Sequence, residues 1–161
     1  MPKILVAYYS RTENSKKVAV LLQKELDCDI EEIIAENSYA GIKGYIQAGK
    51  EGTKKIAAKI KPAVKNAQDY DLVIVGGPVW GWIISSPVRA YLEQNKDKIK
   101  SIAGYCTMGG SEGKTFEEME LVCGKNLAAK IAVKDRDISS DKTAGEIKSY
   151  CATILNNIKQ K

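Results

Sequence analysis

The chain has 161 residues and a net charge of +5, and its 44% hydrophobic and 28% charged residues are typical of one globular domain, expected over residues 1–161. No apolar run reaches the length of about 18 residues that a membrane-spanning helix needs, and Met1-Pro2-Lys3 does not open a signal peptide, so we expect a cytoplasmic protein. Histidine is absent, which excludes His-assisted nucleophiles and His-ligated metals; we expect no metal site and no catalytic side chain, and any chemistry must come from a cofactor.

Short apolar segments alternate with segments of helical periodicity along the chain. The sequence predicts strands at 3–9, 29–35, 72–76, 101–107 and 129–135. It predicts helices at 15–26, 51–66, 87–98, 115–124 and 143–158, with an irregular segment rich in Gly and Tyr at 36–50. This alternation is typical of an α/β fold, in which a parallel sheet carries helices on both faces. Ligands of such folds bind at the carboxyl ends of the strands, so we expect the functional residues in the loops after the first, third and fourth strands.

The loop after the first strand is rich in hydroxyl and amide side chains. Between an apolar strand and an amphipathic helix lie Ser10, Thr12, Asn14 and Ser15. The first backbone amides of a helix have no partner within it and carry the positive end of its dipole. Together these groups would form a set of hydrogen-bond donors suited to a phosphate. The same residue types are ordinary helix caps, so the loop alone leaves both interpretations open.

Two later loops contain unusual residues. The loop after the third strand, Gly76-Gly77-Pro78-Val79-Trp80-Gly81-Trp82, contains both tryptophans of the chain. Two large rings at a glycine-rich turn suit a flat aromatic ligand, although both could equally cap the core at the edge of the sheet. The loop after the fourth strand is Thr107-Met108-Gly109-Gly110-Ser111-Glu112-Gly113. Its glycines would let backbone groups approach a ligand closely, or would simply form a flexible turn.

Three other phosphate-binding or nucleotide-binding folds are not supported. Met108–Thr115 nearly matches the G-x-x-x-x-G-K-(S/T) loop of nucleoside triphosphatases, but Met108 takes the place of the first glycine. The first loop lacks the G-x-G-x-x-G pattern of dinucleotide-binding domains. A phosphoacceptor domain needs acidic residues at the ends of the first and third strands, and this chain has none there.

Taken together, the three loops resemble those of the flavodoxin family, whose phosphate loop reads approximately (S/T)-x-T-G-(N/Q)-(S/T). The segment Ser10-Arg11-Thr12-Glu13-Asn14-Ser15 follows that pattern except at Glu13. Pro78, Trp80 and Gly81 are similar to the family's second loop, and Thr107-Met108-Gly109-Gly110-Ser111 is similar to its Thr-x-Gly-Gly-Ser third loop. The likeness extends over essentially the whole chain, with the loops in the same order.

The resemblance implies a three-layer, flavodoxin-like fold with a five-stranded parallel sheet of order 2-1-3-4-5 that binds FMN non-covalently. The first loop would hold the phosphate, and the other two would flank the flavin ring. The cofactor-binding residues implied in this way are Ser10, Arg11, Thr12, Asn14, Ser15, Pro78, Val79, Trp80, Gly81, Trp82, Thr107, Met108, Gly109, Gly110 and Gly113. Of the two tryptophans, we expect Trp80 to stack on the flavin and Trp82 to pack nearer the protein.

The resemblance implies electron transport by a flavoprotein whose FMN cycles through its semiquinone and hydroquinone. The partner would be another redox protein, which is acidic if the lysine-rich segment is its docking surface. An NAD(P)H-dependent quinone or flavin reductase acting on a small acceptor is the alternative, and a non-redox FMN-binding interaction module is a third. A stable semiquinone would favour the carrier, whereas direct oxidation of NAD(P)H would favour the oxidoreductase enzyme. The carrier is the preferred interpretation, and the enzyme stays open.

Glu13 departs from the family pattern, which usually has glycine there. A carboxylate beside a phosphate dianion is unfavourable unless it points into solvent. A glutamate also favours a negative φ. We therefore expect Glu13 to point outward with a negative φ, and Arg11, Lys16 and Lys17 to offset its charge.

Positive charge is concentrated in one segment of the chain. Against the single acid Glu51, residues 41–66 contain Lys43, Lys50, Lys54, Lys55, Lys59, Lys61 and Lys65. These lysines form either an ordinary solvated helix face or a docking surface for an acidic partner or an anionic ligand. Nucleic acid is not expected, because the segment contains no recognised nucleic-acid-binding motif. Since residues 36–50 would leave the second strand beside the first, they could bring Tyr39, Tyr45 and the first lysines beside the FMN site.

Overall fold

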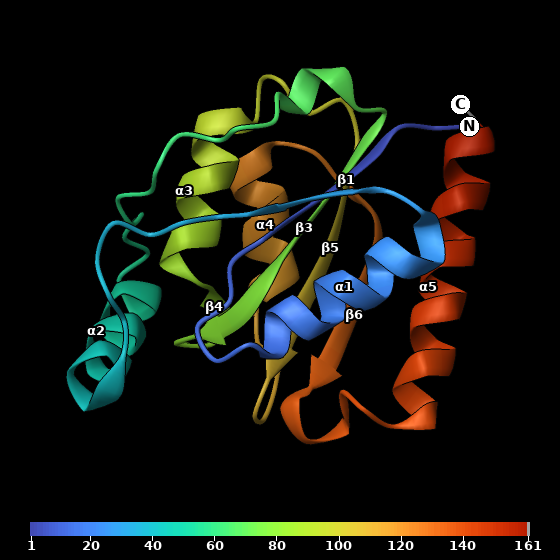
Figure 1. Ribbon diagram of the computed structural model, residues 1–161. Helices are drawn as coiled ribbons and strands as arrows, with labels where there is room; N and C mark the ends of the chain where they lie inside the picture. The colour runs from blue at the N-terminus through green and yellow to red at the C-terminus, as the bar shows by residue number, and fades with distance from the viewer. Residues whose placement is uncertain (161) are drawn as a thin grey trace.

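The computed structural model describes residues 1–160 and shows an α/β fold of three layers (Figure 1). Its parallel strands are β1 (Ile4–Tyr8), β2 (Asp29–Glu32), β3 (Leu72–Trp80), β5 (Ile102–Met108) and β6 (Leu127–Lys134), in the sheet order β2-β1-β3-β5-β6. A short strand, β4 (Ile83–Ile84), pairs antiparallel with the end of β3. The predicted fold class and the order of the five parallel strands are therefore confirmed, and β4 is an additional strand.

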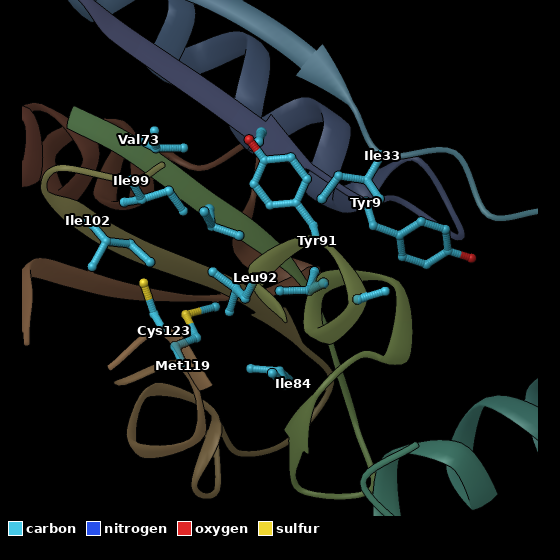
Figure 2. Close-up of a cluster of buried hydrophobic side chains, with 14 of the residues drawn as sticks. Tyr9, Ile33, Val73, Ile84, Tyr91, Leu92, Ile99, Ile102, Met119 and Cys123 are labelled. Carbon is cyan, nitrogen blue, oxygen red and sulfur yellow. The ribbon is translucent and has the colours of Figure 1, made fainter. Parts of the chain in front are cut away.

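Alternating side chains of the strands form a hydrophobic core on each face of the sheet. Ile4 and Val6 of β1 belong to one core, and Leu5 and Ala7 belong to the other. The first core is covered by α1 (Asn14–Leu26) and α5 (Asp141–Lys159), and the second by α3 (Ser86–Asn95) and α4 (Thr115–Cys123) (Figure 1). Figure 2 shows the second core, in which Tyr91, Leu92 and Met119 lie against the strands that carry Val73 and Ile102. Burial on both faces explains why the central strands are continuous apolar runs.

The helix predicted at 51–66 is wrong. The structure instead has α2 at Gly41–Thr53, mostly within the segment 36–50 that was expected to be irregular. Irregular chain and a 3-10 helix, η1 (Ala67–Asp69), follow it. Glycine weakens the helical signal of this segment. Close packing nevertheless favours the helix, since a Cβ at Gly44 would lie 2.0 Å from the backbone of Tyr39. The other four helices lie close to their predicted positions.

The four cysteines of the chain are free. Cys106, Cys123 and Cys151 are buried, and Cys28 is half-buried. Burial raises the pKa of the Cys106 thiol to about 12, so this group stays protonated and unreactive. Within residues 1–160, no helix has both the length and the apolar character needed to cross a bilayer.

Candidate functional site

A cavity of about 620 Å³ opens at the carboxyl ends of the parallel strands, where the strand order reverses between β1 and β3. Its walls are the loops after β1, β3, β5 and β6, together with α2. The lining residues are Arg11, Thr12, Tyr45, Ala48, Gly49, Thr53, Pro78, Val79, Trp80, Gly81, Trp82, Thr107, Met108, Gly109, Gly110, Ser111 and Asp135. The three loops expected to carry the function therefore meet at one site. A second cavity, of about 810 Å³ between β6 and α5, contains none of the predicted site residues.

The first loop presents Thr12 and the amino end of α1 near this cavity. Glu13 takes the N-cap position, but its side chain makes no capping hydrogen bond, and the first turn of α1 contains no acidic residue. Apart from the Lys16 N–H, the first backbone amides of the helix are therefore open to a ligand. The Ser10 hydroxyl oxygen accepts a hydrogen bond of 3.2 Å from the Lys16 N–H and keeps its own proton for another acceptor. This donor set suits an anion.

Two of the predicted phosphate donors are engaged elsewhere. The Ser15 hydroxyl lies 2.6 Å from the Thr107 hydroxyl, and both residues are buried. This pair joins α1 to β5, and the Tyr105 hydroxyl strengthens the junction by donating to the Ser15 carbonyl at 2.8 Å. Asn14 hydrogen-bonds to the Asp135 carboxylate. Ser15 can therefore offer a ligand its backbone amide but not its side chain.

Arg11 connects the first loop to the segment that leads into α2. Its Nε donates to the Tyr39 carbonyl at 2.8 Å, and its Nη2 donates to the Gly41 carbonyl at 3.2 Å. The guanidinium also lies over the Tyr45 ring, 5.6 Å from the ring centroid. The expected proximity of Tyr45 to the site is confirmed, and Arg11 is the residue that holds this segment there.

Glu13 points outward as expected, with its side chain 70% exposed and 3.7 Å from Lys16 Nζ. The expected negative φ is wrong, because the φ of Glu13 is 69°. The sharp turn from β1 into α1 needs a left-handed residue at the N-cap, where glycine would be unstrained. The chain thus keeps the turn but places a strained glutamate in it.

The second loop is a β-hairpin. β3 extends to Trp80, Gly81 and Trp82 form the turn, and β4 returns with Ile83 opposite Trp80. The φ angles of Gly81 and Trp82 are 58° and 67°. Two consecutive positive φ values in a two-residue loop correspond to a type I′ turn. Tryptophan is strained in this conformation, and the strain lies at the cavity wall.

The two tryptophans lie in opposite environments. Trp80 is 6% exposed and packs edge-on against Tyr9, with ring centroids 5.5 Å apart, and tilted against Tyr39, at 4.8 Å. Trp82 is 68% exposed. Both tryptophans line the cavity, but the ring with a free face is Trp82 and not Trp80, the ring expected to stack on the flavin. The strand directs Trp80 into the core, and the turn directs Trp82 outward.

Neighbouring elements fix the hairpin turn from two sides. On the α2 side, a Cβ at Gly81 would lie 2.5 Å from the Thr53 hydroxyl oxygen. On the other side, the Lys114 N–H donates to the Trp82 carbonyl at 2.8 Å, and Gly113 packs against the same carbonyl. Gly113 therefore supports the turn and does not line the cavity.

Several cavity residues were not predicted from the sequence. Ala48, Gly49 and Thr53 come from α2, which the sequence pattern placed wrongly. Asp135 follows β6, at the same edge of the sheet as the predicted loops. Partial burial raises the pKa of its carboxyl group, while the hydrogen bond from Asn14 acts to lower it. Ligands of such folds bind at the carboxyl ends of the parallel strands, but we expected functional residues only after the first, third and fourth strands. The same rule, applied also to the fifth predicted strand, 129–135, would have found Asp135.

Glu51, the single acid of the lysine-rich segment, lies on the buried face of α2. Its carboxylate accepts hydrogen bonds from the Tyr39 hydroxyl at 2.7 Å, the Ser86 hydroxyl at 2.6 Å and the Gln47 amide at 2.8 Å. Burial acts to raise the pKa of Glu51, but the three hydrogen bonds outweigh it, so the pKa lies below its usual value. This network fixes α2 against the start of α3.

Comparisons with known proteins give one family and a consistent fold. A family model described as flavodoxin matches residues 3–151. A flavoprotein structure from Bacteroides eggerthii is 22% identical, with 96% of this chain and 99% of that chain covered and a TM-score of 0.77. A flavoprotein from Lactobacillus acidophilus, solved in complex with FMN, is 24% identical over 88% of this chain and 98% of that chain, with a TM-score of 0.71. A WrbA-like flavodoxin from Agrobacterium tumefaciens is 16% identical over 99% of both chains, with a TM-score of 0.68. No curated protein sequence matches the chain.

Proposed function

The chain belongs to the flavodoxin family, whose cofactor is FMN, and from this premise we propose that it is a carrier that passes electrons through FMN held in the cavity at the ends of β1, β3 and β5. The observation that carries the proposal is the pairing of two features: a helix end beside the cavity whose N-cap side chain makes no capping hydrogen bond, and an exposed aromatic ring on the cavity wall. The first suits a phosphate, and the second suits a flat ring system.

The cavity fits FMN in size and in chemistry. A volume of about 620 Å³ lies within the range of small-molecule sites. The open amides of α1 and the hydroxyls of Ser10 and Thr12 are donors for the phosphate. Gly109 and Gly110 leave space for a ring, since a Cβ at either position would have no atom within 4 Å. We assign Trp82 and residues 107–110 to the flavin ring.

The charges on the cavity wall support a low-potential carrier. Bound FMN supplies the redox chemistry. Arg11 is the one cation among the lining residues of the described chain, and the Tyr39 and Gly41 carbonyls engage its guanidinium. Asp135 adds a carboxylate on the same wall. A cavity wall with few available cations stabilises negative charge on a bound flavin poorly. Such a wall therefore favours release of electrons from the reduced cofactor.

Trp82 favours the carrier over an NAD(P)H-dependent quinone or flavin reductase. A hydride donor must lie flat against the flavin ring to react. The Trp82 side chain, stacked on that face, would keep a nicotinamide away from it. The hairpin turn is fixed by α2 and by Lys114, so the backbone keeps Trp82 at this wall of the cavity.

Titration of the purified apoprotein with FMN and with riboflavin tests the assignment of the phosphate. We expect FMN to bind at least about tenfold more tightly, since each hydrogen bond to a charged group contributes about 1.5–3 kcal/mol. Thr12→Ala should narrow this difference, whereas Thr153→Ala, an exposed threonine on α5, should not. Equal affinities of the wild-type protein for the two flavins would reject the assignment.

An anaerobic measurement on the FMN-loaded protein separates the three functions. A carrier should show two well-separated one-electron reduction potentials and negligible oxidation of NADH or NADPH. Rapid turnover of NAD(P)H with a quinone would instead identify a reductase. If FMN binds tightly but the protein neither exchanges electrons with partner proteins nor oxidises NAD(P)H, the protein is a non-redox FMN-binding module.

A further inference from the structure

Helix α2 exposes its large apolar side chains. Ile42 is 82% exposed, Tyr45 69% and Ile46 63%. The residues that it buries are Gly44, Ala48, Glu51 and Gly52. Surface helices usually bury an apolar stripe and expose their charges, so α2 has the reverse arrangement. Because residues three and four apart are neighbours on a helix, the three exposed side chains share one surface, which we call the α2 face.

Close packing fixes this reversed orientation. Glu51 is held from below by the hydroxyls of Tyr39 and Ser86. A Cβ at Gly52 would lie 2.1 Å from the Trp80 carbonyl oxygen, so no other residue fits there without movement. A rotation of α2 that buried Ile42 and its neighbours would move Glu51 out of its hydrogen bonds. The α2 face is therefore a fixed part of the surface.

The α2 face is continuous with the cofactor cavity. Tyr45 belongs to both, and Gly49 and Thr53 on the next turns also line the cavity. Figure 1 shows α2 at the periphery of the molecule, on the side where β3 and β4 end. A molecule seated on the α2 face would thus lie beside the cavity mouth and close to Trp82.

The segment that carries the α2 face is rich in positive charge. Residues 37–68 contain seven lysines and one acid, Glu51, which is buried. Lys55 is paired with Glu118, and Lys65 lies 3.9 Å from Asp29. Within the described residues no ion pair engages the exposed lysines nearest the face, which are Lys43, Lys50 and Lys54.

We propose that the α2 face docks an acidic redox protein whose contact surface has carboxylates around an apolar centre. An apolar centre with a charged rim is typical of protein interfaces, and opposite charges steer the encounter. A second copy of this chain fits less well, because a two-fold contact through α2 would bring the two sets of lysines together. The proposal rests on the proposed function, since the partner would exchange electrons with FMN in the adjacent cavity.

Binding of two small redox proteins of opposite charge tests the proposal. The probes are an acidic plant-type ferredoxin and a basic cytochrome c, titrated calorimetrically into the apoprotein and into the FMN-loaded protein. At low salt we expect the ferredoxin to bind at least about tenfold more tightly than the cytochrome, and we expect the preference to disappear near 1 M salt, where the Debye length is about 3 Å. The titration of the apoprotein tests docking independently of FMN binding. Ferredoxin binding without FMN binding would therefore keep the docking surface and reject the electron-transfer role.

Two double variants locate the binding on the α2 face. Ile42→Ser with Ile46→Ser removes the apolar centre, and Lys43→Glu with Lys50→Glu reverses the rim. Each should weaken ferredoxin binding at least about tenfold, and the second should strengthen cytochrome binding. The matched controls are Val20→Ser with Leu121→Ser, which alter exposed apolar residues elsewhere, and Lys24→Glu with Lys148→Glu, which alter the helices on the other face of the sheet. The controls should bind as the wild type does.

Three results would overturn the proposal. The first is equal binding of the two probes, or ferredoxin binding that both α2 variants retain. The second is binding to vesicles of anionic phospholipid that requires the α2 face, without ferredoxin binding, which would identify a membrane surface as the partner. The third is a dimer in sedimentation equilibrium that Ile42→Ser with Ile46→Ser dissociates, again without ferredoxin binding.

Discussion

Glu13 holds a left-handed backbone conformation that glycine would adopt without strain. A residue with a side chain in the left-handed conformation destabilises the folded state by roughly 1–2 kcal/mol. Replacing it with glycine recovers only part of this, because glycine has more conformational freedom to lose on folding. We expect Glu13→Gly to stabilise the protein by about 0.5–1 kcal/mol in urea unfolding. It should also tighten FMN binding, and more so at low salt, because it removes a negative charge near the proposed phosphate site.

Two variants separate the backbone effect of Glu13→Gly from its charge effect. Asp27, at the carboxyl end of α1, also has a positive φ, of 47°. Asp27→Gly should give a similar gain in stability with unchanged FMN affinity. Glu13→Gln should tighten FMN binding without the gain in stability. Weaker FMN binding in Glu13→Gly would show that the glutamate has a positive role in the loop.

Trp82 and Trp80 should respond differently to truncation. We expect FMN to quench much of the tryptophan fluorescence, and we expect Trp82→Ala to remove most of this quenching and weaken FMN binding about tenfold. Trp80→Ala should instead destabilise the fold by about 3–5 kcal/mol, because Trp80 is packed against Tyr9 and Tyr39. Fluorescence titration and urea unfolding of both variants check these expectations. Unchanged quenching in Trp82→Ala would place the flavin elsewhere.

At the scale of the elements, two buried glutamates join the helices to one another. Glu51 links α2 to α3, and Glu118 of α4 accepts hydrogen bonds from Arg89 of α3 at 2.6 Å and from Lys55 at 2.7 Å. For Glu118, burial acts to raise the pKa, but the bonds from Lys55 and Arg89 outweigh it and lower the pKa. Both carboxylates therefore stabilise the fold in their charged forms.

These lowered pKa values predict loss of stability in acid. The contribution of each glutamate is fully present above its unfolded pKa, near 4.5, and is lost as the pH falls through its lower folded pKa. We expect Glu51→Gln to be less stable than the wild type at neutral pH by about 1–3 kcal/mol and to lose less of its remaining stability in acid. Urea unfolding across this pH range is the measurement, with the exposed Glu117→Gln as the control that should follow the wild type.

The contact between α2 and the hairpin depends on glycine at position 52. We expect Gly52→Ala to destabilise the protein by more than about 2 kcal/mol, since its Cβ would lie 2.1 Å from the Trp80 carbonyl oxygen. Gly145→Ala is the matched control, because a Cβ there meets nothing within 4 Å in α5 and should stabilise the helix by about 0.5–1 kcal/mol. If both variants gained stability, α2 would not be held against the hairpin as described.

The sequence predicts those elements whose residues act locally and misses those that depend on distant contacts. The apolar strands and the amphipathic helices α1 and α5 follow from periodicity alone. α2 could not be predicted, because Gly44 and Gly52 weaken its local signal and its stability comes from Tyr39 and Trp80. The hairpin was missed for a similar reason, since nothing in Gly81-Trp82 indicates that a tryptophan will accept a positive φ.

At the scale of the whole molecule, the cavity is assembled from segments between Arg11 and Asp135, so its ligand should stabilise the entire fold. A ligand present at 100 times its dissociation constant adds about 2.7 kcal/mol. For a domain of this size we expect FMN at that excess to raise the Tm by about 5–10 °C. Scanning calorimetry over a series of FMN concentrations checks this, and riboflavin at the same concentrations should give a smaller shift. Identical shifts would mean that the phosphate is not bound.

The strained turn at Trp82 also bears on how this protein can be engineered. Glycine or asparagine at that position would accept the positive φ at lower cost, and a smaller side chain would expose less apolar surface. A laboratory selection for heat resistance alone would therefore favour variants that lack the indole. If Trp82 stacks on the flavin as proposed, such a selection would enrich proteins that are more stable to heat but bind FMN more weakly. At position 82, selection for thermal stability and selection for activity would therefore favour different amino acids.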